Sequence, residues 1–202
     1  AVLVEDMWYY EHLQEEDESQ KKEYAAVKEA LEHFEQLELL GGLLYVNDTP
    51  AAMTVASYIN EVFAETYADG SMKETAEKYG VQEALVGQKD AKYEASASDS
   101  DVEYIKNKGT LIVGITEFEP MDYQDGDEWI GFDADMARIV ADKLGVEAQF
   151  VVIDWDNKIM ELDSKNIDVV WNGMTLTDEV TSSMECTNAY CNNAQVVVEP
   201  QK

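Results

Sequence analysis

Three polar segments directly follow apolar, strand-like runs, and they hold the side chains best suited to binding a small ligand. They are residues 116–123, 154–157 and 172–178. In the third segment, Gly173 permits a close backbone approach and Thr175 offers a hydroxyl group. Thr177 precedes two acidic residues, which is typical of a helix N-cap. Exposed N–H groups at such a helix start favour an anion, although a plain capped helix fits the same pattern.

Two further positions follow from strand alternation and from helix-start signals. Trp171 is expected in the core, and Asn172 then points toward the ligand edge of the sheet. Asp154 and Asp156 flank Trp155 after the second strand. They fit equally well as acids at the rim of a cleft or as helix N-caps.

The second half of the chain alternates apolar strands with amphipathic helices. We expect strands at 110–115, 148–153, 167–171 and 194–198, with helices after Asp133, over 157–163 and after Thr177. Asp133 is expected to cap its helix and Gly145 to end it. This order predicts an α/β fold, a parallel-rich sheet covered by helices, with ligands beyond the carboxyl ends of the strands.

The first half has a different pattern. The apolar periodicity predicts a strand over 1–4, an amphipathic helix from Tyr24 that Gly41-Gly42 ends, and a short strand over 43–46. Helices follow from Val55 to about Asp69 and over 72–79, the second closed by Gly80. Residues 89–100 lack periodic apolar positions and are expected to be a linker.

Composition excludes several classes of function. The 202 residues include 14 basic and 43 acidic side chains, a formal net charge of −29. Such a chain lacks the cations to bind nucleic acid or an anionic membrane surface. A hydrophobic fraction of 46% allows a real core, and no run of 18 apolar residues occurs. The opening AVLVEDMWYY has no charged leader region, as expected of a mature or cytosolic form.

Catalytic and metal-binding motifs are not found in the sequence. Residues 101–202 contain no histidine, nucleophile elbow, phosphate loop or dinucleotide fingerprint, so we expect neither an enzyme nor a cofactor. Cys186 and Cys191 are too few to hold zinc without the remote histidines, His12 and His33. Their spacing leaves open two free thiols or a local disulfide.

Longer motifs in the sequence resemble those of a known protein family. The runs GTLIVGITEFEPMDY, GFDADMARIVADKLGV and IDVVWNGMTLTDE within 101–202 resemble the first lobe of type 2 solute-binding proteins of polar amino acid ABC transporters. INEVFAETYADGSMKETAEKYG resembles the closing helices of that family, LLYVNDTP its returning hinge strand, and AVLVED a second-lobe strand.

This order implies a circularly permuted chain with a reduced second lobe. Its parts would be a remnant or replacement of the second lobe (1–40), the hinge strand with the closing helices (41–88), the linker (89–100) and the first lobe (101–202).

The resemblance also implies how each part of an amino acid is bound. The segment with Gly173, Thr175 and Thr177 would hold the carboxylate through backbone N–H groups. Val180 stands where most members of the family have a clamping arginine. That substitution puts carboxylate affinity in doubt, or shifts it to the backbone donors.

The remaining ligand contacts are implied in the same way. Phe118 would stack on the ligand, and the neighbouring Glu117 would contact a polar or cationic side chain. Asn172 would face the cleft. Glu5 would bind the ammonium group, although an ordinary surface acid fits that position equally well in so acidic a chain.

The resemblance therefore implies an extracytoplasmic receptor for a small polar amino acid. It would close around the ligand at a hinge and serve a transporter permease. The protein would be periplasmic or a lipoprotein on the outer face of a Gram-positive membrane, and a second chain could complete lobe two. An engineered or rearranged scaffold module that keeps the lobe without full ligand binding is the alternative. A dehydratase-type enzyme on the same fold is the third.

Overall fold

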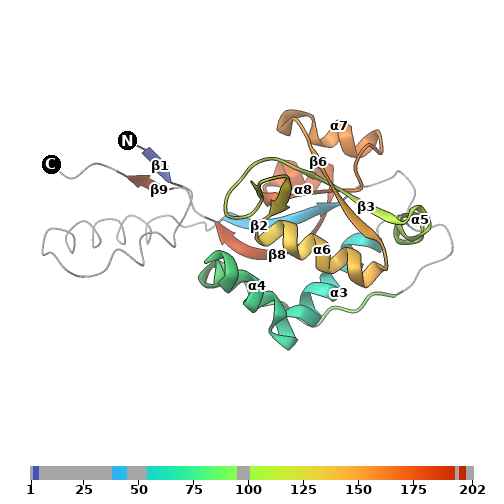
Figure 1. Ribbon diagram of the computed structural model, residues 1–202, viewed down its shortest axis with the longest axis horizontal. Coiled ribbons are helices and arrows are strands. Elements are labelled where there is room, and N and C mark those ends of the chain that lie inside the picture. Colours follow the sequence, from blue (N-terminus) through green and yellow to red (C-terminus); the bar gives the residue numbers. More distant parts are fainter. Residues whose placement is uncertain (1, 5–37, 45–53, 95–100, 194–195, 199–202) are drawn as a thin grey trace, which may run out of the picture.

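In the computed structural model, a five-stranded sheet has helices on both faces (Figure 1). The structure describes residues 2–4, 38–44, 54–94, 101–193 and 196–198. The helices are α3 (Thr54–Asp69), α4 (Ser71–Tyr79), the 3-10 turn η1 (Gln82–Ala84), α5 (Asp101–Lys108), α6 (Phe132–Leu144), the 3-10 turn η2 (Trp155–Asn157), α7 (Lys158–Asp163) and α8 (Asp178–Ser183). The strands are β1 (Val2–Val4), β2 (Glu38–Leu44), β3 (Thr110–Ile115), β4 (Tyr123–Asp125), β5 (Glu128–Ile130), β6 (Glu147–Val152), β7 (Val169–Thr175), β8 (Glu185–Asn193) and β9 (Val196–Val198).

The strand order of the large sheet is β6-β3-β7-β2-β8. β3 pairs in parallel with both β6 and β7, whereas β2 runs antiparallel to β7 and β8. The sheet is therefore parallel-rich with one reversed strand, as the α/β prediction requires. β2 comes from early in the chain and lies between two strands of its last third. Two small antiparallel pairs, β1 with β9 and β4 with β5, complete the described strands.

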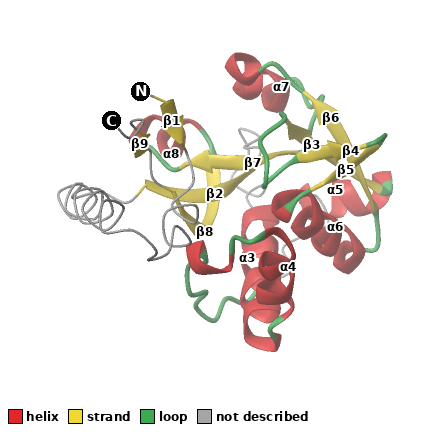
Figure 2. Cartoon of the chain, turned by 60° about the vertical axis from the view of Figure 1, so that its left-hand side comes forward, coloured by secondary structure: helices red, strands yellow, loops and turns green. Residues whose placement is uncertain are grey.

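Apolar side chains fill both faces of the sheet. On one face, α3, α4, α5 and α6 cover residues that include Val113, Val169 and Trp171. On the other face, α7 packs over Val170 and Met174. Figure 2 shows α3, α4 and α6 together on one side of the sheet and α7 on the other. The alternation of successive β7 residues between the two faces explains why the run Val169–Trp171 is continuously apolar.

The helices of the first half share this core. Phe63 of α3 meets Trp171 and Tyr190 edge-on, with ring centroids 5.7 and 5.5 Å apart. Trp171 is 2% exposed, which confirms its predicted core position. Such aromatic pairs add directional attraction to the burial of large apolar area. Residues 54–79 therefore share the hydrophobic core on this face of the sheet with residues of the range 101–193.

Local signals placed several elements correctly. β3 spans the predicted 110–115, and α3 and α4 lie within one residue of their predicted bounds. Gly80 and Gly145 end α4 and α6 in the left-handed conformation, as expected. Residues 89–94 of the predicted linker have no helix or strand. The remainder of the linker and most of the helix expected from Tyr24 lie outside the described residues.

Three expectations were wrong or incomplete. Gly41-Gly42 does not end a helix but lies within β2, where the pairing register with β7 shifts between Gly41 and Leu43. A glycine pair permits such a bulge as readily as a helix end. Asp133 does not cap α6, because the N-cap position is Gly131. β8 and α5 were not predicted at all.

A nearly buried ion pair links Lys108, the last residue of α5, to Asp168, which directly precedes β7. The Lys108 ammonium lies 2.6 Å from both carboxylate oxygens of Asp168, whose side chain is 6% exposed. Asp168 also accepts a hydrogen bond of 2.7 Å from the Ile112 N–H. The carboxylate therefore joins a helix and two strands, and its removal would leave two donors without their acceptor.

Two other carboxylates, those of Asp122 and Asp133, are fully buried close to one another. Burial, reinforced by the charge of Asp133, raises the pKa of Asp122 to about 10, and Arg138 opposes the shift. Burial also raises the pKa of Asp133, to about 7, while the Tyr190 hydroxyl, the Gly173 N–H and the Trp171 indole oppose it. Neither Asp122 oxygen has a hydrogen-bond partner in the structure. The folded state therefore favours a protonated Asp122.

The first prediction concerns the ion pair. Asp168→Ala should lower the free energy of unfolding by about 3 kcal/mol, because it strands the Lys108 ammonium and the Ile112 N–H. Urea unfolding at pH 7 measures this. Glu77→Ala breaks the exposed pair with Lys73, at 3.7 Å, and should cost less than about 0.5 kcal/mol. Equal effects of the two substitutions would contradict the structural role assigned to Asp168.

The second prediction concerns pH. A carboxyl group whose pKa is higher folded than unfolded binds its proton more tightly in the native state. Stability is then greatest near pH 4, the unfolded pKa, and falls as pH rises toward the folded pKa. Each such group contributes up to about 1.4 kcal/mol per pH unit. Asp122→Asn should therefore flatten the decline in unfolding free energy between pH 5 and pH 8.

Asp125→Asn is the matched control, because it is the same substitution at an exposed residue of the adjacent strand β4. It should leave the pH slope of the unmodified chain in place. If both variants showed that same slope, Asp122 would not be protonated in the folded state.

Candidate ligand-binding site

A cavity of about 410 Å³ opens beyond the carboxyl ends of β3, β6 and β7. This is the edge of a parallel sheet at which ligands are expected. Its lining residues are Thr116, Phe118, Trp155, Lys158, Asn172, Gly173, Met174, Thr175, Thr177, Val180 and Asn193. The three polar segments named from the sequence all contribute to this wall. Five predicted ligand residues, namely Phe118, Asn172, Gly173, Thr175 and Thr177, lie together in it.

Asn172 connects two strands at the edge of the cavity. Its Oδ1 accepts a hydrogen bond of 2.8 Å from the Thr116 N–H, and its Nδ2 donates to the Thr116 Oγ1 at 2.6 Å. The side chain thereby joins the end of β3 to β7. Asn172 was predicted to contact ligand, but both ends of its amide already have a partner in Thr116. Its clearest role is to position Thr116 on the cavity wall.

The backbone N–H of Gly173 is bonded to the buried carboxylate of Asp133. The N–H donates to Asp133 Oδ2 at 2.6 Å, and the Gly173 φ of 57° is a left-handed value that suits glycine. The Asp133 carboxylate belongs to the first turn of α6, so this bond ties the helix to β7. The Gly173 N–H is therefore not available to a bound anion, contrary to the role that the resemblance implied.

The predicted N-cap at Thr177 is confirmed. Its Oγ1 accepts a hydrogen bond of 3.2 Å from the Val180 N–H, and its own N–H donates to the Thr175 carbonyl at 3.0 Å. The helix that it caps, α8, has six residues. So short a helix supplies a weak dipole. The N–H groups of Gly173, Thr177 and Val180 are all bonded within the chain, so the expected backbone cradle for a carboxylate loses these three donors.

The aromatic and acidic residues predicted to contact a ligand do not all lie in the cavity wall. Phe118 is half-buried and lines the cavity, with its backbone N–H bonded to the Asp122 carbonyl at 2.6 Å. Glu117 is exposed and is not part of the lining. Asp154 caps η2 by accepting the Asp156 N–H at 3.1 Å, so the N-cap alternative holds for it. Glu5 lies outside the described residues.

Sequence reasoning missed Trp155 and Lys158 as cavity residues. Lys158 is half-buried, and its ammonium donates to the Trp155 carbonyl at 3.1 Å and lies 4.8 Å from the centroid of the Trp155 ring. Both follow the strand β6. Trp155 lies in the segment 154–157 that the rule on strand ends selected, and Lys158 is the residue directly after it. The signal that could have found them is a cation three residues after an aromatic, within reach of its ring and carbonyl. Asn193, at the end of β8, was missed because that strand was not predicted.

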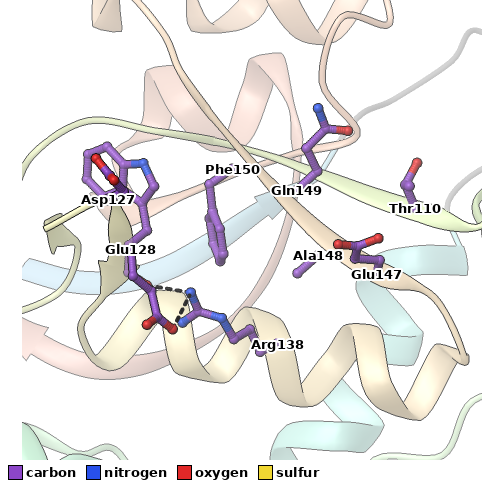
Figure 3. A pocket seen from close by; sticks show the side chains of 9 residues that line it. Thr110, Asp127, Glu128, Arg138, Glu147, Ala148, Gln149 and Phe150 are labelled. Atoms are coloured by element: carbon purple, nitrogen blue, oxygen red, sulfur yellow. Dashed lines mark hydrogen bonds and ion pairs between the residues drawn. The ribbon is translucent and has the colours of Figure 1, made fainter. Parts of the chain in front are cut away.

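A second hollow, of about 480 Å³, lies beside the edge strand β6 and the hairpin β4–β5 (Figure 3). The Arg138 guanidinium lies 4.9 Å from the Phe150 ring centroid, donates to the Asp135 carboxylate at 3.1 Å and lies 3.8 Å from Glu128. It also donates to the Trp129 carbonyl. The charge of Arg138 is thus compensated within the protein, and this hollow offers no free cation.

The cysteines settle an alternative that the sequence left open. Cys186 and Cys191 are free thiols. They belong to one strand, β8, and pack into the cores on opposite faces of the sheet. The local disulfide considered from their spacing is therefore wrong, because their side chains diverge. Burial raises the pKa of both thiols, so neither is a reactive thiolate.

Over the described ranges, no group of three or more metal-binding side chains comes together. No helix in the same ranges has the length and apolarity needed to cross a membrane.

Comparisons with known proteins agree on the second half of the chain. Residues 111–202 match the family model of the bacterial extracellular solute-binding proteins, family 3. The L-cystine-binding protein TcyJ of Escherichia coli (strain K12) is 38% identical over 88 residues, 43% of this chain and 33% of that protein. The arginine-binding extracellular protein ArtP of Bacillus subtilis (strain 168) is 33% identical over 103 residues, 50% of this chain and 40% of that protein.

Among solved structures, the arginine-bound form of truncated ArgBP from T. maritima is 39% identical, with a TM-score of 0.38. That match covers 40% of this chain and 39% of that one. The chain spans about a third to two fifths of the length of the curated relatives that it matches. The match of residues 111–202 to the bacterial extracellular solute-binding proteins, family 3, includes every described residue of the cavity lining.

Proposed function

We propose that the chain binds a small polar amino acid in the cavity at the carboxyl ends of β3, β6 and β7. The observation that supports this most directly is that residues from separate polar segments of the sequence line the same cavity. Phe118, from the segment 116–123, lines one hollow with Asn172, Gly173, Thr175 and Thr177, which come from the segment 172–178. A cavity with one aromatic side, several hydroxyl and amide groups and a single cation suits a small polar solute. The relatives named as cystine- and arginine-binding proteins make an amino acid the leading ligand class.

Each part of the wall suits one part of such a ligand. The Phe118 ring offers an apolar face, while the Thr175 hydroxyl and the Asn193 amide offer hydrogen bonds. The cavity is open on one side, so one lobe alone would hold the ligand loosely. Closure would require contacts from a second lobe, which the ligand selects by binding both sides at once.

The second lobe and the partners are part of the same proposal. The permuted order predicts that the lobe comes from the start of the chain, with Glu5 as the partner of the ligand ammonium, or from a second chain. The hinge would include β2 and β9. As a transport receptor, the protein would deliver its ligand to an ABC transporter permease on the outer side of the cytoplasmic membrane.

A binding role suits the cavity better than catalysis does. Among the described lining residues, Lys158 is the one ionisable side chain. Proton transfer at a reacting centre normally needs a paired acid or base within hydrogen-bond reach. The carboxyl groups with strongly raised pKa values, those of Asp122 and Asp133, lie in the core and not on the cavity wall.

The third prediction tests binding directly. In a thermal-shift screen with the twenty common amino acids and L-cystine at millimolar concentration, one ligand class should raise the melting temperature. A ligand at one hundred times its Kd adds about 2.7 kcal/mol, or roughly 5–10 °C for a chain of this size. Thr175→Val and Phe118→Ala should each abolish most of that shift while the unliganded chain still melts cooperatively.

Thr75→Val is the matched control for the hydroxyl. Thr75 lies on α4, where its Oγ1 donates to the Ser71 carbonyl, and it is not part of the cavity. That variant should retain the full ligand shift. An undiminished shift in both site variants would place the ligand elsewhere. No shift with any amino acid would favour a scaffold module that keeps the lobe without its binding function.

A further inference from the structure

The cavity wall contains one cation, and its position is well defined. Lys158 is the first residue of α7, and its side chain lies back against the preceding turn η2. The ammonium donates to the Trp155 carbonyl at 3.1 Å and lies 4.8 Å from the centroid of the Trp155 ring. These two contacts use one of its three N–H donors and the face of one ring. The remaining donors are left for another acceptor.

Lys158 also differs from five of the other lysines in the described part of the chain. Lys73, Lys78, Lys106, Lys108 and Lys143 each have a carboxylate oxygen within 4.0 Å. In the described part of the chain, no salt bridge of that length is found for Lys158. The nearby Asp154 carboxylate accepts the Asp156 N–H instead, and neither of these acids belongs to the cavity lining.

Other sources of positive potential in the wall are weak. Val180 lines the cavity and has no charge, and the N–H groups of Gly173 and Thr177 are satisfied by Asp133 and by Thr175. The lining residues include no carboxylate. The cavity therefore combines one cation that lacks an internal carboxylate partner with neutral hydrogen-bonding groups.

We infer that Lys158 is the contact for an anionic group of the ligand, which for an amino acid is its α-carboxylate. The inference rests on the proposed function and adds to it the residue that recognises the acid. A charge-assisted bond to an ammonium already held by Trp155 loses little side-chain entropy on binding. The cavity thus takes a small molecule with a carboxylate and discriminates against the same molecule as an amide.

The test measures the affinity of two forms of the ligand, the free acid and its α-amide, for the unmodified chain and for variants of Lys158. Calorimetry compares L-arginine, L-histidine, L-glutamine and L-cystine with their α-amides, on the unmodified chain and on Lys158→Gln. The substitution should weaken binding of the acid by about 10- to 100-fold, the range for a hydrogen bond to a charged group. Binding of the amide should change by less than about threefold, so the cycle isolates the contact between Lys158 and the carboxylate.

Two further variants separate this role from structural effects. Lys158→Arg keeps the charge and should retain acid binding within about fivefold. Lys73→Gln removes the same charge from an exposed position on α4 and should change neither affinity. If Lys158→Gln does not fold, the inference is tested on the unmodified chain alone. That chain should bind the acid at least about tenfold more tightly than the amide, and a smaller ratio would contradict the inference.

The outcomes distinguish the two proposals. Acid binding that is unaffected by Lys158→Gln, or a loss that is equal for acid and amide, would overturn the inference and leave amino acid binding intact. A chain that binds none of these four amino acids, and none of those in the thermal-shift screen, would overturn both proposals. A selective loss for the acid, restored by Lys158→Arg, would support both.

Discussion

The hydrogen bond from the Gly173 N–H to the buried carboxylate of Asp133 is the constraint on which the rest of the site depends. It joins the first turn of α6 to β7, the strand that supplies much of the cavity wall. A buried carboxyl group is costly unless its oxygens find donors, so the helix start and the strand cannot move apart cheaply. Gly173 has a left-handed φ of 57° at this position, a conformation that suits glycine.

A pair of hydrogen bonds also joins β7 to the end of the neighbouring strand β3. The two bonds between Asn172 and Thr116 hold the ends of β3 and β7 together, one residue before Gly173. Polar groups at the carboxyl edge of the sheet therefore divide into two sets. Asn172 and the Gly173 N–H fix the frame, while Lys158, together with the apolar ring of Phe118, would contact the proposed ligand. A frame that is set without a ligand lowers the ordering cost of binding.

The sequence predicted those features that are set by local chemistry. The bounds of β3, the N-cap at Thr177 and the terminal glycine Gly145 all depend on residues within one turn or one strand. The family motifs then placed five ligand candidates at one edge. This worked because strand order brings the ends of β3 and β7 together whatever the loops between them do.

The features that were missed depend on partners remote in the chain. An acid at a helix start looks like an N-cap, and only the packing of α6 under β7 makes Asp133 a buried acceptor for Gly173. Gly41-Gly42 looks like a helix stop until β7 and β8 pair with it. β8 mixes cysteine, threonine, asparagine and tyrosine, so its sequence has no continuous apolar run to mark an edge strand.

The net charge of the chain bears on which ligands the cavity can accept. A field from 29 excess negative charges repels a simple anion at long range, although salt screens it beyond about 8 Å under physiological conditions. An amino acid with an uncharged side chain is a zwitterion with no net charge, so it is neither repelled nor attracted strongly on approach. Once inside, its carboxylate would be close to Lys158, and its ammonium would face the negative potential of the surrounding chain. Recognition by one local cation within an acidic protein thus favours a zwitterion over a plain anion.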